Sequence, residues 1–341
     1  IKQLPGNINT NGAEINFLQT NDSTAFFTVI NNEDEFRESS IYTCTLIDNE
    51  WRDKRYTKYN NDILNTANIS FSKREKVVLS NCNKEMKECK IGFLDIKNSE
   101  GYREIPLGYQ KETLNTQGHI TKHNGQEVLY FVSDRKGGFG GLDIWLSIID
   151  KEGNFGIPIN AGNKINSSAD EITPFFNTND GNMYFSSNRK KSAGGFDIYK
   201  TEGRFNLWNK PQNVKELNTK QDEMYLTFYN KNEGHLASNR KGAKFENAEY
   251  CCNDIFSFKY LYPKEDTTTF LSDIYNCLPL ALYFHNSEPD FFTMNSTTKK
   301  TYKDTYISYF KMKDEYQRQN TNLNDFFEKE LQANFNRLNI I

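Results

Sequence analysis

The feature of the sequence that most constrains the fold is a phrase that recurs along the chain. It reads FVSDRKGGFGGLDIW from Phe131 and FSSNRKKSAGGFDIY from Phe185. A second phrase contains Asn-Thr or Asn-Ser and recurs about every fifty residues, around Asn9, Asn65, Asn115, Asn166 and Asn218. Five units at this period are typical of a repeat architecture.

Each unit contains four short stretches in which apolar and polar residues alternate. In the fourth unit these stretches include DEITPFF, MYFSSNR and FDIYKTE, separated by turns rich in glycine and asparagine. Four short strands per unit are typical of the blade of a β-propeller. Paired helices are the alternative for this period, but the units lack apolar residues at i, i+3 and i+4.

The sequence therefore predicts a mainly β fold, a β-propeller with five visible four-stranded blades over residues 1–262. A linker over 263–276 and a small α/β or helical C-terminal segment over 277–341 are expected to follow. The ring closes with five blades, or a sixth blade comes from residues outside this chain. The N-terminal IKQLPG is a candidate for the outer strand of the last blade. Because the chain begins with Ile, we expect it to be a processed product or a piece of a longer protein.

Arginine and aspartate recur eight residues apart in the third and fourth units, with glycines between them, and the fifth unit keeps both residues around a longer insertion. In a hairpin, this spacing places Arg at the end of one strand and Asp near the start of the next. We predict that each Arg–carboxylate pair clasps its hairpin, while the glycines supply positive φ for the turn. A calcium ion held in these turns is a minor alternative. The candidate clasp residues are Arg135, Asp143, Arg189, Asp197, Arg240 and Asp254.

Two of the six cysteines are placed to form a disulfide. Cys82 and Cys89 flank NKEMKE in a predicted hairpin, so they lie close together if the strands pair. We predict a disulfide between them, which would imply an oxidising compartment; free thiols are the alternative. A zinc site is not expected, because no CxxC pair is present.

The sequence assigns no residue to catalysis, to a cofactor or to a metal. His119 and His123 lie four residues apart, but no further ligand is near them in sequence, which favours ordinary strand histidines. The acidic pairs at 170–171 and 222–223 recur at one position of the repeat, which favours hydrogen bonding between blades over acid–base chemistry. A net charge of −3 without a basic run argues against a nucleic-acid site.

The phrase YFSSNR, followed by a glycine turn and GGFDIY, resembles the repeat of TolB-type, WD-repeat-like β-propellers. The resemblance covers roughly residues 1–262 and is strongest in the third and fourth units. Further on, LPLALYFHNSEPD from Leu278 resembles the opening strand of an OmpA-like C-terminal domain, in the variant found in Bacteroidota envelope proteins. The motif NxxLSxxRA, near which such domains place their peptidoglycan-binding Asp and Arg, is absent. Peptidoglycan binding would therefore require the domain to be completed beyond this chain.

Two helices are predicted in the C-terminal segment. Thr301 and Asp304 are placed to cap the first helix. Its aromatic stripe would comprise Tyr302, Tyr306, Tyr309 and Tyr316. The apolar face of the second helix would comprise Phe327, Leu331, Phe335 and Leu338.

The resemblance implies a non-catalytic scaffold in the envelope of a Gram-negative bacterium, periplasmic or associated with the outer membrane. Its propeller would dock envelope proteins in a multi-subunit complex, and the domain order resembles that of an accessory protein of the type IX secretion and gliding machinery. Partner contacts are expected at the loop insertion 241–253. The alternative function is a glycan-binding or hydrolytic propeller that uses its central channel.

Overall fold

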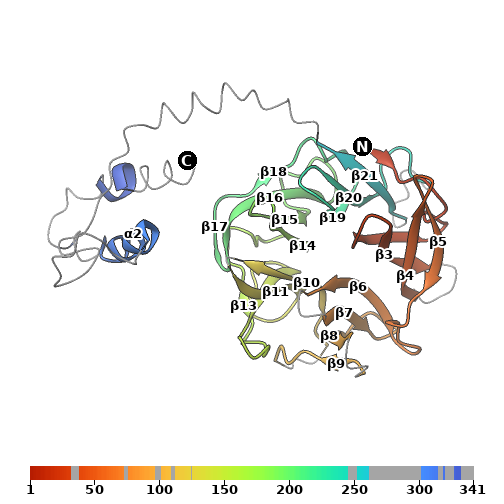
Figure 1. The fold of residues 1–341 in the computed structure, drawn as a ribbon, viewed down its shortest axis with the longest axis horizontal. Coiled ribbons are helices and arrows are strands. Elements are labelled where there is room, and N and C mark those ends of the chain that lie inside the picture. Colours follow the sequence, from red (N-terminus) through yellow and green to blue (C-terminus); the bar gives the residue numbers. More distant parts are fainter. Residues whose placement is uncertain are drawn as a thin grey trace. The chain divides into compact units, whose positions relative to one another are not determined.

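The computed structural model describes residues 1–31, 38–72, 76–96, 101–108, 112–123, 125–244, 252–260, 301–313, 318 and 326–331. The chain divides into two compact units, residues 1–261 and 262–341, each described by itself. In the first unit, five β-sheets surround one axis (Figure 1). This arrangement confirms the predicted five-bladed propeller, and the ring closes without a sixth blade.

Each blade runs outward from an inner strand next to the axis, and neighbouring strands are antiparallel. The first blade consists of β2 (Ala13–Gln19), β3 (Thr24–Asn31), β4 (Glu38–Ile47) and β5 (Glu50–Tyr56). The second blade consists of β6 (Asn65–Phe71), β7 (Lys76–Cys82), β8 (Cys89–Asp95) and β9 (Arg103–Glu104). The third blade consists of β10 (Asn115–His123), β11 (Gln126–Ser133), β12 (Asp143–Ile149) and β13 (Ile159–Asn160).

The last two blades vary this plan at their outer edges. The fourth blade consists of β14 (Glu171–Asn177), β15 (Asn182–Ser187) and β16 (Asp197–Arg204), with the short strands β17 (Leu207–Trp208) and β18 (Gln212–Asn213) both paired to β16. The fifth blade consists of β19 (Glu223–Phe228), β20 (Glu233–Ser238), β21 (Asp254–Lys259) and β1 (Lys2–Gln3).

The N-terminus closes the ring, as IKQLPG suggests. Strand β1 pairs with β21 at the outer edge of the last blade, where Figure 1 shows the red N-terminal strand beside the teal β21. The N–H of Leu4 then donates to the carbonyl of Ile255, and the Leu4 side chain is buried. The first and last blades are thereby joined through backbone hydrogen bonds and apolar packing.

One apolar cluster lies at each of the five seams between neighbouring blades. Between the third and fourth blades, for example, the rings of Tyr130 and Phe185 are buried. The alternation of side chains along each strand places one set of apolar residues in each seam. Trp51, Trp145 and Trp208 are buried in these clusters, so they pack the core.

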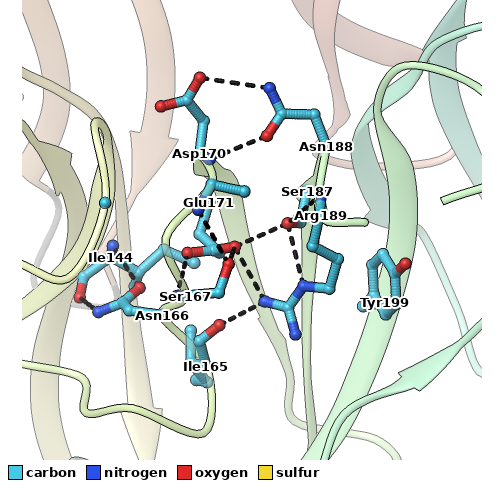
Figure 2. Close-up of polar contacts among 12 residues, drawn as sticks. Ile144, Ile165, Asn166, Ser167, Asp170, Glu171, Ser187, Asn188, Arg189 and Tyr199 are labelled. Carbon is cyan, nitrogen blue, oxygen red and sulfur yellow. Dashed lines mark hydrogen bonds and ion pairs between the residues drawn. The ribbon is translucent and has the colours of Figure 1, made fainter. Parts of the chain in front are cut away.

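An asparagine of the second phrase joins each of several blades to the preceding one. The amide of Asn166 accepts from the N–H of Ile144 at 2.9 Å and donates to its carbonyl at 2.8 Å, replacing a neighbouring strand (Figure 2). Asn9, Asn60 and Asn218 make the same pair of bonds. In the second sequence repeat the equivalent residue is thus Asn60, whereas Asn65 begins the inner strand β6.

Every inner strand contains a β-bulge at the same position. At each bulge a non-glycine residue has positive φ; these residues are Asn16, Asn68, Gln117, Thr173 and Tyr225. Asparagine tolerates this conformation, but in a β-branched or bulky residue such as Thr or Tyr it is strained. The repeated bulge therefore costs stability, and it lies on the axis of the propeller.

In the second unit, α2 (Tyr302–Lys311) begins with the predicted capping box of Thr301 and Asp304. A π-helical segment, η2 (Phe326–Leu331), packs Phe327 and Leu331 against α2. Several predicted features lie outside the described residues, namely the linker 263–276, Leu278, Tyr316, Phe335, Leu338 and most of the insertion 241–253. No described helix is long and apolar enough to span a membrane.

Candidate functional site

The arginine of the repeated phrase binds the first strand of its own blade. In the fourth blade, Nη2 of Arg189 lies 3.0 Å from Oε1 of Glu171 (Figure 2). The same nitrogen donates to the carbonyl of Ile165, and Nε donates to Oγ of Ser187 at 3.0 Å. The guanidinium carbon is also 4.8 Å from the centre of the Tyr199 ring. Arg189 therefore links three polar groups and an aromatic ring within one blade.

The same arrangement recurs in the fifth blade and, with one replacement, in the third. Arg240 lies 3.1 Å from Glu223 and donates to Ser238 at 3.1 Å. In the third blade, Asn115 takes the place of the glutamate and accepts from Nη2 of Arg135 at 2.6 Å. A neutral acceptor thus fills this position, and Nη1 of Arg135 donates to the carbonyl of Leu107.

The aspartates of the phrase bind the backbone of the glycine turn. Asp197 accepts hydrogen bonds from the N–H groups of residues 193 and 194, at 2.7 and 3.2 Å, and from Nδ2 of Asn213 at 2.6 Å. Asp143 and Asp254 make equivalent bonds in their own blades. Each carboxylate therefore joins the backbone of the turn to a side chain of the outer strand of its blade.

The predicted pairing of arginine with aspartate is therefore not what the structure contains. Strand register places Ser187 opposite Asp197, so the aspartate begins the third strand and its carboxylate binds the turn. Arg189 instead reaches the opposite side of the hairpin, where Glu171 begins the first strand. Each phrase therefore supplies two separate sets of contacts: the arginine binds the first strand of the blade, and the aspartate binds the glycine turn.

The glycines of the turn are required mainly by close approach to the next blade. A Cβ added to Gly140 would lie 2.0 Å from the carbonyl oxygen of Ala169, and one added to Gly194 would lie 2.0 Å from that of Gln221. In the turns of the third and fourth blades only Gly137 has the positive φ that we expected for the whole set, and in the fifth blade Gly242 has it. The phrase thus also determines how closely successive blades pack.

The recurrent acidic pairs connect neighbouring blades, as predicted. Asp170 accepts from the N–H of Leu142 in the third blade at 2.8 Å, and its own N–H donates to Asn188 (Figure 2). Asp222 accepts from the N–H of Phe196 across the next seam at 2.8 Å. These hydrogen bonds explain why the acidic pair recurs at one blade position.

Cysteines contribute to the second blade. Cys82 and Cys89 occupy directly opposed positions of β7 and β8 and form a disulfide with an S–S distance of 1.98 Å. At the arginine position this blade has Asn83, which accepts from the N–H groups of residues 87 and 88. Cys44 is buried and free.

A pocket lies on the propeller axis, where the five inner strands meet. It has a volume of about 440 Å³ and receives residues from β2, β6, β10, β14 and β19. All five left-handed bulge residues line it. Strained backbone of this kind clusters at ligand sites, where the surrounding structure compensates for its cost. The pocket is therefore the best candidate for the functional site.

The described lining of this pocket is uncharged and amphipathic. Its aromatic members are Phe26, Phe71, Phe175 and Tyr225, with the imidazole of His119. Amides and hydroxyls come from Asn16, Gln19, Thr20, Asn68, Ser70, Gln117, Thr173 and Thr227. Apolar walls with a few placed polar groups are typical of small-molecule sites.

The predicted histidine pair separates in the structure. His119 lines the pocket with its ring 4.8 Å from that of Phe175, and burial lowers its pKa to about 4. It is therefore neutral at physiological pH. His123 is buried against the ring of Phe176, and burial likewise lowers its pKa. Neither residue belongs to a cluster of potential metal ligands among the described residues.

Gln117 connects its own blade to three others beside the pocket. Its Oε1 accepts from the N–H of Thr173 at 2.7 Å, and its Nε2 donates to Oη of Tyr225 at 3.2 Å. Its own N–H, released from the strand ladder by the bulge, donates to Oγ of Ser80 at 3.1 Å. Burial raises the pKa of Tyr225, so its hydroxyl is neutral.

Comparison with known proteins finds the fold but no sequence family. No family model matches the sequence, and no curated protein matches it. The structure is similar to that of a thermostable family-43 glycoside hydrolase, with a TM-score of 0.51, 11% identity, and coverage of 76% of this chain and 94% of that one. An endo-arabinase from Bacteroides thetaiotaomicron has a TM-score of 0.47 at 10% identity, covering 77% of this chain and 99% of its own. At this identity the likenesses show the fold alone.

The likeness to the family-43 enzyme corrects the expectations that came from the TolB-type and OmpA-like resemblance. The solved structure that is similar at a TM-score of 0.51 is a glycoside hydrolase, so the assignment to TolB-type scaffolds is wrong, and so is the expectation of a non-catalytic secretion scaffold. The physical reason lies in the phrase itself. Its Arg, Asp and Gly fasten a hairpin and pack neighbouring blades, which are needs of propeller architecture that specify no function.

Apart from His119, the pocket residues were not singled out by the sequence analysis. The bulge residues are two Asn, one Gln, one Thr and one Tyr, so no residue type marks the position. They share only their place in the repeat. Each lies two residues after the position that Glu171 occupies near the start of the inner strand. An alignment of the units anchored there would have placed them together, but not in a pocket.

Proposed function

We propose that the propeller binds a neutral saccharide in its central pocket. The observation that carries the proposal is the convergence of five bulge residues with positive φ on an uncharged pocket lined by aromatic rings, amides and hydroxyls. Sugars present apolar C–H faces that pack on aromatic rings, and hydroxyls that hydrogen-bond with amides and hydroxyls. The absence of charge among the described lining residues disfavours phosphorylated or carboxylated ligands, which need cationic partners.

The fold likeness supports the same class of ligand. The family-43 enzyme with this fold is named as a glycoside hydrolase, so its ligands are glycosides. Cleavage of a glycosidic bond generally uses two carboxyl groups that flank it. The described lining contains no Asp or Glu. We therefore propose saccharide binding, and the same experiment also measures cleavage.

The test is calorimetric titration of the purified chain with neutral pentoses, hexoses and their oligosaccharides, with glucuronate as the charged comparison. Product release from the oligosaccharides is followed by chromatography. We expect neutral saccharides to bind and Phe175→Ala to weaken that binding roughly threefold to tenfold through loss of ring packing. Phe139→Ala, in an exposed glycine turn, is the matched control. Absence of binding, or equal affinities of the two variants, would overturn the proposal.

We also propose that the protein works in an oxidising compartment outside the cytoplasm. The support is the disulfide between Cys82 and Cys89, since such bonds persist in oxidising compartments. Trapping thiols by alkylation during cell lysis, followed by peptide mass spectrometry, tests this. Recovery of both cysteines as alkylated thiols would contradict it. The envelope partners expected from the sequence stay a prediction.

A further inference from the structure

The five bulge residues around the pocket are not equivalent in their hydrogen bonding. Three of them belong to the third, fourth and fifth blades and are connected to one another, through the side chain of Gln117, as described above. In addition, Oγ1 of Thr173 donates to Oγ of Ser186 at 2.9 Å. These polar groups are therefore largely engaged within the protein.

The other two bulge residues, Asn16 and Asn68, lie in the adjacent first and second blades. Nδ2 of Asn68 donates to Oγ1 of Thr116 at 3.2 Å, and its backbone N–H donates to Oγ1 of Thr28 at 3.2 Å. The side-chain oxygen of each asparagine is buried, and neither oxygen has a hydrogen-bond partner in the described part of the chain. Asn68 itself is only 6% exposed.

A buried amide oxygen without a donor is unfavourable, because it has given up its bonds to water. Here two such oxygens belong to side chains that line one pocket, on neighbouring strands. Asparagine also adopts positive φ more readily than other non-glycine residues, so the bulge holds both amides at little conformational cost. The site thus has two unpaired amide oxygens on one side, whereas the polar groups of the other bulge residues are hydrogen-bonded within the protein.

We infer that Asn16 and Asn68 determine ligand specificity by accepting hydrogen bonds from two hydroxyl groups of the saccharide. The inference rests on the proposed function and deepens it. A site that offers acceptors to hydroxyl groups rejects analogues that lack them, because the acceptors are then left unpaired. The pocket therefore prefers saccharides with two free hydroxyls on one edge over their deoxy or O-methyl derivatives.

Glycine substitutions test the two asparagines without straining the backbone, since glycine accepts positive φ. Asn16→Gly and Asn68→Gly are compared with Asn49→Gly, which makes the same change at a residue with positive φ in the turn between β4 and β5. Each protein is titrated with the best-binding saccharide and with its monodeoxy and O-methyl derivatives. Thermal unfolding first verifies that each variant is folded.

We expect each pocket variant to bind the parent saccharide roughly threefold to tenfold more weakly, and Asn49→Gly to bind it unchanged. Removal of at least one hydroxyl group from the saccharide should weaken its binding to the unaltered chain but not to one of the asparagine variants. In that variant the hydrogen bond between the hydroxyl group and the asparagine is already absent. If saccharides bind but the asparagine variants match the control, this inference fails and the proposed function stands. If no saccharide binds, both fail. Should a glycine variant not fold, undiminished affinity of the unaltered chain for every deoxy and O-methyl derivative would overturn the inference.

Discussion

Nη2 of Arg189 lies 3.0 Å from Oε1 of Glu171, and the carboxylate side chain is fully buried while the arginine side chain is 18% exposed. Arg240 and Glu223 repeat the pair in the next blade at 3.1 Å. Both arginines also donate to the backbone carbonyl of the residue that precedes the asparagine of the second phrase, Ile165 or Leu217. The pair is thus a structural unit of the blade, and its loss affects folding.

Arg189→Ala should lower the free energy of unfolding by about 3 kcal/mol, because it leaves the Glu171 carboxylate buried without its cation. Chemical denaturation at neutral pH measures this. Arg52→Ala is the matched control, since Arg52 pairs with Glu50 at 2.6 Å but both side chains are about half exposed. A loss no larger than that of the control would contradict the structural role, and saccharide affinity should be unchanged.

Glu14 makes stability depend on pH in the first blade. It accepts from the N–H and hydroxyl of Thr10 as Glu171 does from Ser167, but no described arginine pairs with it. Burial raises its pKa from 4.5 to about 7. The folded state therefore binds more protons than the unfolded state between these values, so this contribution is complete below about pH 4.5 and is lost as pH rises through about 7.

Glu14→Gln should remove this dependence, which amounts to about 3 kcal/mol between pH 4.5 and pH 8. Denaturation curves at intervals across this range give the slope. Glu233→Gln is the control: its pair with Lys259 lowers the pKa of Glu233, so its contribution has the opposite sign. Equal slopes for Glu14→Gln and the unaltered chain would show that Glu14 does not titrate in this range.

The disulfide should stabilise the second blade by restricting the unfolded chain. Replacement of both Cys82 and Cys89 by serine should lower the free energy of unfolding by about 2–3 kcal/mol, as expected for a short closed loop. The measurement is denaturation with and without a reductant. The difference between variant and unaltered chain should vanish in the reductant, and a difference that persists would indicate a packing defect instead.

Closure of the ring depends on the N-terminal segment. Leu4 is 6% exposed in the seam between the first and last blades. Leu4→Ala should cost about 2–4 kcal/mol, the usual range for a buried leucine. Ile1→Ala, at a residue that is 50% exposed, should cost little. Comparable unfolding midpoints for the two variants would mean that this seam does not support the ring.

Much of the fold could be predicted from local pattern, while the site could not. Alternation in DEITPFF and MYFSSNR, with glycine turns after them, predicted hairpins correctly, because strand and turn preferences act over a few neighbouring residues. The partners of Arg189 and Asp197 could not be read from their spacing. The direction of each side chain depends on strand register, and the pairing of Ser187 with Asp197 separates them.

The amino-acid sequence by itself determined the five-unit repeat, the hairpins within each unit and the N-terminal closing strand. Only the tertiary structure decided that five bulges converge and that an uncharged pocket forms there, because its contacts join distant parts of the chain. Gln117 and Tyr225, whose side chains meet beside the pocket, are 108 residues apart. A local pattern carries no information about such a contact, which arises only when the ring closes and brings the inner strands onto one axis.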